Sequence, residues 1–208
     1  LPQIEVVELE LEGVIAQSGQ PELKLAVLGM QQSGKTQFLK TLQGVAYSNH
    51  LQTTEVAYDG FSVKLPNGRE MKIASGTDLG GAQHFVRRYA EISKNCDAVI
   101  FVFDVYKFKN DDDYRLQTRA RIEYFRDMNL PYDRKFVIGS FADKFSGDEA
   151  KAKAQDFVYS HMSDIYPNIK AQNFFMRDMR DRTQVLDICK RVFLARYPYL
   201  SWIVQGIN

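Results

Sequence analysis

Eight consecutive residues form the strongest chemical motif of the chain, Gly29-Met30-Gln31-Gln32-Ser33-Gly34-Lys35-Thr36. They fit the pattern G-x-x-x-x-G-K-S/T, in which glycines allow backbone N–H groups to surround a phosphate. Lys35 would reach the outer phosphates of a nucleotide as a positive charge, and the Thr36 hydroxyl would ligate Mg²⁺. We therefore predict a nucleotide-binding loop whose residues are Gly29, Gln31, Gln32, Ser33, Gly34, Lys35, Thr36 and Gln37.

The residues on either side of this loop supply the structural context that the pattern needs. Residues 23–28 form a short apolar run bounded by turn residues, which predicts a strand buried on both faces. A helix is expected over 35–42, ending at Gly44. The N-terminus of such a helix offers unpaired donors and a partial positive charge to a phosphate. A chance Lys-Thr after a glycine-rich turn is the alternative, and it leaves this strand and helix unexplained.

A second motif, Asp78-Leu79-Gly80-Gly81, begins 42 residues after Thr36. A carboxylate at the end of a strand in the same sheet is well placed to hold Mg²⁺ through water. The glycines would let a backbone N–H at Gly81 approach the outermost phosphate. Alone, D-x-G-G is a weak pattern that often marks a plain turn, but its position after a phosphate loop, one helix and one hairpin makes it much stronger.

The remaining elements alternate between strands and helices. Residues 61–74 predict a β-hairpin that turns at Pro66-Asn67-Gly68. Further strands are expected at 98–105, 136–140 and 171–176, and helices at 83–94, 111–127, 148–166 and 183–197. This alternation predicts an α/β fold, with a mostly parallel central sheet, one antiparallel edge hairpin and helices on both faces.

The two ends of the chain carry less specific patterns. Residues 4–12 alternate between apolar and acidic side chains, which favours an extra strand over the alternative of an amphipathic helix. Residues 198–208 form an aromatic and apolar tail that either packs on the domain or docks a partner or the rest of a longer chain. We expect an N-terminal extension over 1–22, one domain over 23–197 and this tail.

Composition excludes several classes of function. The 27 Lys and Arg residues balance 26 Asp and Glu residues, so the chain is not a strongly basic nucleic-acid binder. No apolar run reaches about 18 residues, so no transmembrane segment is expected. Two cysteines without metal-ligand spacing suit a cytoplasmic setting. We expect that any contact with a membrane is peripheral and made through a partner protein. Four arginines within 111–127 are interpreted as a solvated helix face or, alternatively, a partner-binding face: Arg115, Arg119, Arg121 and Arg126.

The phosphate loop and the D-x-G-G motif together resemble the small GTPases, especially their Arf-like and Rab-like branches, over roughly residues 23–197. The resemblance implies a P-loop NTPase fold, GTP or GDP with Mg²⁺ as ligands, and effector or regulatory proteins as partners. It places Thr36 and Asp78 at the metal. It also implies a switch threonine before the hairpin that ligates Mg²⁺, for which Thr54 is selected and Thr53 is the alternative.

The base-reading motif of these proteins, N-K-x-D, is altered to Ser140-Phe141-Ala142-Asp143. Asp143 retains the carboxylate that the resemblance assigns to guanine. Ser140 replaces the asparagine, and Phe141 replaces the stacking lysine, although an aromatic face also stacks on a base. The family's final S-A-K loop is expected near 176–178 and is not recognisable there.

The glutamine that orients the attacking water in these proteins is replaced by Ala82, and Gln83 and His84 follow it. Either Gln83 or His84 takes over this catalytic role, with or without a partner, or hydrolysis is very slow. Two functions therefore stay open. One is a GTP/GDP-binding molecular switch with slow or partner-assisted hydrolysis, and the other is a non-hydrolysing pseudo-GTPase that serves as an interaction scaffold. A P-loop ATPase or kinase is a weaker third reading.

Overall fold

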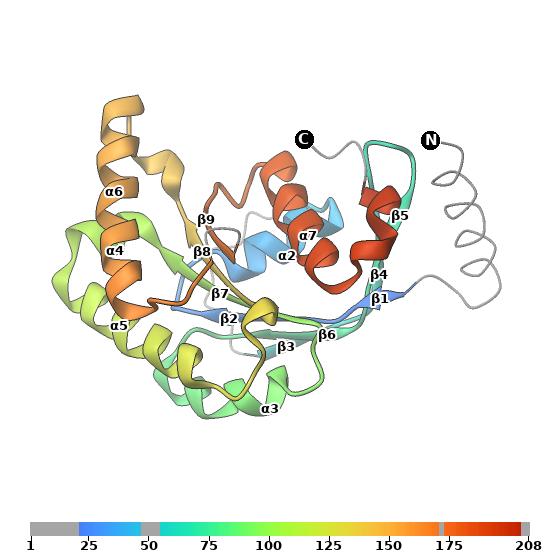
Figure 1. The fold of residues 1–208 in the computed structure, drawn as a ribbon, viewed down its shortest axis with the longest axis horizontal. Helices are drawn as coiled ribbons and strands as arrows, with labels where there is room; N and C mark the ends of the chain where they lie inside the picture. The colour runs from blue at the N-terminus through green and yellow to red at the C-terminus, as the bar shows by residue number, and fades with distance from the viewer. Residues whose placement is uncertain (1–20, 47–54, 171–172, 205–208) are drawn as a thin grey trace.

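The computed structural model describes residues 21–46, 55–170 and 173–204. A central sheet lies between two layers of helices (Figure 1). The predicted strand over 4–12 and the predicted metal ligand Thr54, with its alternative Thr53, lie outside the described residues.

Within the described residues, six strands form the main sheet, in the spatial order β3-β6-β2-β7-β8-β9. Its centre consists of three buried parallel strands, β2 (Leu25–Gly29), β7 (Ala98–Asp104) and β8 (Lys135–Ser140). β9 (Phe174–Met176) extends this parallel arrangement at one edge. At the other edge, β6 (Gly76–Leu79) runs parallel to β2, and β3 (Glu55–Tyr58) runs antiparallel to β6. The mostly parallel α/β fold predicted from the sequence is confirmed.

The predicted hairpin is longer than expected and divides between two sheets. β4 (Phe61–Lys64) and β5 (Glu70–Ile73) pair around a turn in which Gly68 has a φ of 79°. Beyond a bend, the same two arms continue as β3 and β6 into the main sheet. At the bend, a Cβ on Gly76 would lie 2.5 Å from the Tyr58 hydroxyl oxygen, so a larger residue there would displace the Tyr58 ring. β1 (Glu22–Leu23) pairs with β5, so the predicted strand over 23–28 is split in two.

Helices cover the two faces of the main sheet (Figure 1). α2 (Lys35–Gln43) and α7 (Arg182–Arg196) cover one face. The other face carries α3 (Tyr89–Ser93), α4 (Val105–Asn110), α5 (Asp112–Asp127) and α6 (Asp148–Ile165). Successive residues of the central strands alternate between two apolar cores, because side chains on a strand point to opposite faces in turn.

Two local predictions need correction. The helix expected over 83–94 is a 3₁₀ helix, η1 (Gln83–Arg88), followed by the short α3. The strand expected over 98–105 stops at Asp104, whose Oδ1 accepts hydrogen bonds from the backbone N–H groups of Tyr106 and Lys107, at 2.8 and 3.0 Å. This capping starts α4, a helix that the sequence pattern did not indicate.

The start of the C-terminal tail packs onto the domain as a 3₁₀ segment, η5 (Pro198–Val204). Leu200, Ile203 and Val204 are buried in the core that α2 and α7 also cover. The Asn67 side chain in the hairpin turn donates a hydrogen bond to the Ile203 carbonyl at 3.0 Å. Of the two interpretations of the tail, packing on the domain therefore holds for these residues.

None of the helices in the described part of the chain is both long enough and apolar enough to cross a membrane.

Replacing a buried side chain of the tail by alanine is expected to destabilise the domain. Ile203 is 1% exposed, so Ile203→Ala should lower the free energy of unfolding by about 2–5 kcal/mol through lost burial and a cavity. Tyr199 is 57% exposed, and Tyr199→Ala should cost less than about 1 kcal/mol. Urea unfolding of both variants tests this, and equal losses would show that the tail is not part of the core.

Candidate functional site

The phosphate loop joins the carboxyl end of β2 to the first turn of α2. Its backbone is unusual at three positions, with φ values of 134° at Gly29, 56° at Gln32 and 87° at Gly34. A Cβ on Gly29 would lie 2.0 Å from the Val102 carbonyl oxygen, so only glycine fits against β7. No side chain caps the first turn of α2 and no acidic residue lies in it. Its N-terminus therefore suits an anion.

Lys35 lies inside the loop and is 5% exposed. Its Nζ donates a hydrogen bond across the loop to the Met30 carbonyl at 2.6 Å. The pKa of Lys35 is lowered to about 8, mainly by burial; the carboxylate of Asp78 opposes this shift, and the nearby guanidinium of Arg121 adds to it. A buried ammonium of this kind is stabilised by an anionic ligand.

Thr36 and Asp78 meet as the two motifs predict. The Thr36 hydroxyl donates to Asp78 Oδ2 at 2.5 Å. Burial raises the pKa of Asp78, while the hydrogen bond from Thr36 and the positive charge of Lys35 act to lower it. The second carboxylate oxygen, Asp78 Oδ1, and the Ser33 hydroxyl are buried without a hydrogen-bond partner among the described residues. Hydroxyl and carboxylate oxygens are donors that Mg²⁺ prefers, so these residues fit a nucleotide-bound Mg²⁺.

Gly81 brings the second motif onto the phosphate loop. A Cβ at this position would lie 2.2 Å from both the Gln31 nitrogen and the Met30 carbonyl carbon. No side chain fits such a contact, so the D-x-G-G motif lies directly on the backbone that would surround a phosphate. A ligand that moves the backbone of Met30 and Gln31 must therefore also displace Gly81.

The glutamines of the predicted site take different positions. Gln31 and Gln32 are exposed, and the Gln32 side-chain oxygen accepts a hydrogen bond from Lys107 on α4 at 3.3 Å. Gln37 donates to the Thr41 hydroxyl one turn further along α2, at 2.8 Å. Gln37 is thus engaged within the helix.

Arg121 is a residue of the site that sequence reasoning missed. The sequence pattern predicts a solvated or partner-binding helix face for Arg121, but its side chain is buried, with 6% exposed. Its Nη1 donates to the Gly81 carbonyl, and its Nε and Nη2 donate to Gln83 Oε1 at 3.1 and 2.9 Å. The available signal was its spacing from Thr118, Ile122 and Phe125, which places all four on one helix face.

The two candidate catalytic side chains, Gln83 and His84, are exposed at the start of η1. The acceptor oxygen of Gln83 is taken by Arg121. The ring of His84 lies 4.0 Å from that of Phe85, centroid to centroid. Within the described residues, no hydrogen bond joins either side chain to the phosphate loop.

The altered base-reading motif follows β8, next to the phosphate loop. Ser140 is buried, and its hydroxyl donates to the Phe103 carbonyl at 2.9 Å. Phe141 has a φ of 59°, and the ammonium of Lys144 lies 4.1 Å from the centre of its ring. Asp143 forms an ion pair with Arg180 at 2.5 Å. The carboxylate expected to read guanine is therefore already paired with a cation.

The loop after β9 contacts the altered base-reading motif and α2. Arg180 joins Asp143 to Asp178, which it contacts at 3.1 Å. The carbonyl of Met179 accepts a hydrogen bond from the Thr41 hydroxyl at 2.6 Å, and a Cβ on Gly34 would lie 3.5 Å from Met179 Cγ. Met179 and Arg180 thus contact α2 and Asp143, and the placement of the final motif near 176–178 stays a prediction.

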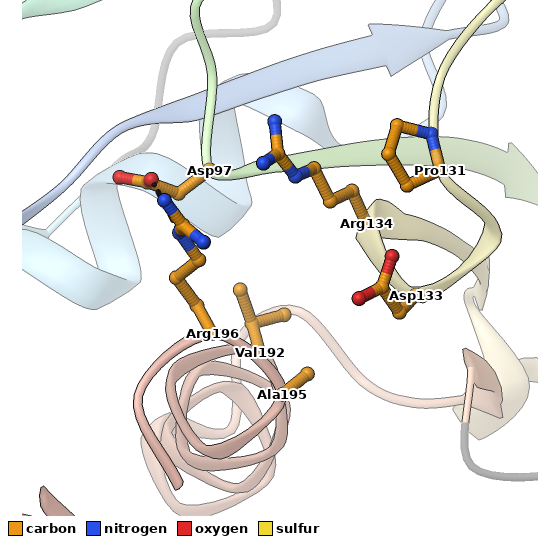
Figure 2. Close-up of a pocket in the computed structure, with 7 residues that line it drawn as sticks. All are labelled: Asp97, Pro131, Asp133, Arg134, Val192, Ala195 and Arg196. Atoms are coloured by element: carbon orange, nitrogen blue, oxygen red, sulfur yellow. Dashed lines mark hydrogen bonds and ion pairs between the residues drawn. The ribbon is translucent and has the colours of Figure 1, made fainter. Parts of the chain in front are cut away.

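A pocket elsewhere on the domain does not suit a nucleotide. It measures about 90 Å³, against roughly 300 Å³ or more for ordinary ligand pockets. Figure 2 shows its lining, in which Arg196 pairs with Asp97 at 3.0 Å. Asp97 precedes β7 and Arg134 precedes β8, so the pocket lies at the amino ends of the strands. The phosphate loop lies at the carboxyl ends, where open α/β sheets bind their ligands.

Comparison with known families supports the reading of the phosphate loop and the D-x-G-G motif. The family model described as ADP-ribosylation factor family matches residues 11–123, which is more than half of the chain. The match includes the phosphate loop, the hairpin and Asp78 to Gly81, and it ends within α5. Asp143 and Arg180 lie beyond it. No curated protein matches the chain.

The buried ammonium of Lys35 predicts a specific pH dependence. Its pKa is about 8 in the folded protein against an ordinary 10.5, so the unfolded chain binds more protons between these values. Stability therefore rises with pH across this window. Lys35→Met removes the buried ammonium, so its free energy of unfolding should exceed that of the wild type at pH 7. We expect this difference to shrink by about 3 kcal/mol between about pH 7 and pH 10.5, because the wild type gains stability over this range. Urea unfolding at stepped pH tests this, and a constant difference would contradict it, with exposed Lys153→Met as the control.

Proposed function

Because this chain belongs to the ADP-ribosylation factor family of small GTPases, we propose that it binds GTP and GDP with Mg²⁺ and acts as a molecular switch. One observation carries the proposal. The phosphate loop, the Thr36–Asp78 contact and Gly81 meet at one edge of the sheet, where Ser33 Oγ and Asp78 Oδ1 are buried with no hydrogen-bond partner in the part of the chain that the structure describes. Such groups are rare in proteins unless a ligand or water satisfies them.

Four side chains would hold the nucleotide and its metal. Lys35 uses one donor on Met30, and its ammonium has two more for phosphate oxygens. Thr36 and Asp78 supply the oxygens toward Mg²⁺, and the Ser33 hydroxyl is a further donor within the loop. When bound, Mg²⁺ would neutralise part of the phosphate charge.

The switch would act through the contact between Gly81 and the phosphate loop. A group added at the outer phosphate position must share space with Gly81, because Gly81 already touches Met30 and Gln31. Arg121 ties Gly81 to α5, and η1 follows directly along the chain. Residues 79–88 are therefore the segment whose arrangement would differ between the GTP and GDP states.

The alternative function, a non-hydrolysing pseudo-GTPase scaffold, is supported by a separate observation. The methyl group of Ala82 cannot orient water, and the oxygen of Gln83 is bonded to Arg121. Both features favour slow hydrolysis without affecting the phosphate loop. A switch exchanges and hydrolyses its nucleotide, whereas the scaffold does not hydrolyse GTP. Measurements of nucleotide binding and of GTP turnover therefore distinguish the two functions.

Thermal unfolding of the nucleotide-stripped chain tests the proposed function. GTP or GDP with Mg²⁺, at about 100 times its dissociation constant, should add about 2.7 kcal/mol of stability. At this length the melting temperature should rise by roughly 5–11 °C. Lys35→Ala should lose the rise, and Lys153→Ala on α6 should keep it. If no nucleotide raises the melting temperature of the wild type, the switch is excluded.

The ion pair of Arg180 with Asp143 predicts weak base discrimination. Guanine would have to compete for a carboxylate oxygen that Arg180 occupies, and an exposed pair of this kind is worth at most about 1 kcal/mol. We expect Arg180→Ala to raise the ratio of GTP affinity to ATP affinity by up to about fivefold. Competition binding measures the ratio. Arg191→Ala, which removes an ion pair on α7, is the control, and a falling ratio would mean that Arg180 itself favours guanine.

A further inference from the structure

We propose that Arg121 is a positioning residue that withholds Gln83 from the attacking water, so that release of this contact sets the rate of GTP hydrolysis. The inference rests on the proposed function, because it concerns the reaction at that site. It goes beyond that function by naming the residue that keeps hydrolysis slow and the atom through which it acts.

The position of Arg121 in the helix is the first step. Thr118, Ile122 and Phe125 form the buried face of α5, and Arg121 lies among them. No carboxylate among the described residues lies within ion-pair distance of its guanidinium. A buried guanidinium without a counter-ion is costly, so its hydrogen bonds decide where it lies. Among its hydrogen bonds are those that it donates to Gly81 and Gln83, within and just after the second motif, and its guanidinium also contacts the Tyr89 hydroxyl.

The chemistry of the Gln83 amide is the second step. A side-chain amide has one acceptor oxygen, and its nitrogen can only donate. Two guanidinium N–H groups donate to that oxygen, at 3.1 and 2.9 Å, and hydrogen bonds from a charged donor are stronger than neutral ones. A glutamine that orients an attacking water must accept from that water. Gln83 therefore cannot act in this way until Arg121 releases it.

The connection of Arg121 to the phosphate loop is the third step. Its Nη1 holds the carbonyl of Gly81, which lies on Met30 and Gln31. At the start of the phosphate loop, the Tyr89 hydroxyl forms hydrogen bonds with the backbone N–H and the carbonyl oxygen of Gly29, at 3.3 and 3.2 Å. Burial raises the pKa of Tyr89, and the neighbouring Arg121 guanidinium opposes that rise. Displacement of Gly81 thus reaches the Arg121–Gln83 contact directly.

Single-turnover hydrolysis of GTP by the full chain, loaded with GTP and Mg²⁺, tests the proposal. Arg121→Met removes the guanidinium and keeps an apolar side chain of similar length. Arg121→Lys keeps the charge but cannot hold Gly81 and Gln83 together. Both variants should hydrolyse GTP faster than wild type, by on the order of tenfold, the effect of one strong hydrogen bond on a barrier. Adding Gln83→Ala to either variant should abolish the gain.

The controls separate this mechanism from a merely structural role. Arg119→Met removes an exposed arginine of the same helix, paired with Glu123, and should leave the rate unchanged. Thermal unfolding establishes which variants fold. If Arg121→Met does not fold, the hydrolysis rate of Arg121→Lys tests the proposal. Slower or unchanged hydrolysis in the folded variants, or a gain that persists without Gln83, overturns the proposal while the switch stands. If the wild type binds no nucleotide, the proposed function itself fails and this inference fails with it.

Discussion

The structure depends on a group of buried charges at the carboxyl edge of the sheet. Lys35, Asp78 and Arg121 lie within one site, and each is almost fully enclosed by protein. Their burial shifts the pKa of Lys35 downward and that of Asp78 upward, which means that the folded protein stabilises neither charge as well as water does. An interior of this kind is favourable only with a ligand that carries compensating charge. A phosphorylated ligand with a divalent cation meets that requirement.

The fold places these charges together through its strand order. β2 and β6 are parallel neighbours, so the loop that follows one and the motif that ends the other emerge at the same edge. α5 lies on the face of the sheet opposite α2, and it places Arg121 beneath the second motif. The two apolar cores hold these elements from opposite sides. The site therefore sits on strands and helices whose positions are set by burial, with glycine at the points of closest approach.

Near two of the places where the chain departs from the small GTPase pattern, an arginine binds a hydrogen-bond acceptor. Asp143 would accept hydrogen bonds from a base, and Arg180 occupies it. Gln83 would accept one from water, and Arg121 occupies it. In the proposed function, these occupied acceptors would reduce base selectivity and turnover without weakening phosphate binding, because the phosphate loop retains Lys35.

The sequence by itself determined the local chemistry and the class of fold. The phosphate loop, the D-x-G-G motif, the turn at Gly68 and the buried strands were all recognisable, because each depends on residues close together in the chain. The sequence did not indicate the bend in the hairpin, the start of α4 at Asp104, or the burial of Arg121. Only the tertiary structure decided which acceptors the arginines occupy. Arg121 and Gln83 are 38 residues apart and Asp143 and Arg180 are 37 apart, and such contacts arise from packing between elements, which no local pattern encodes.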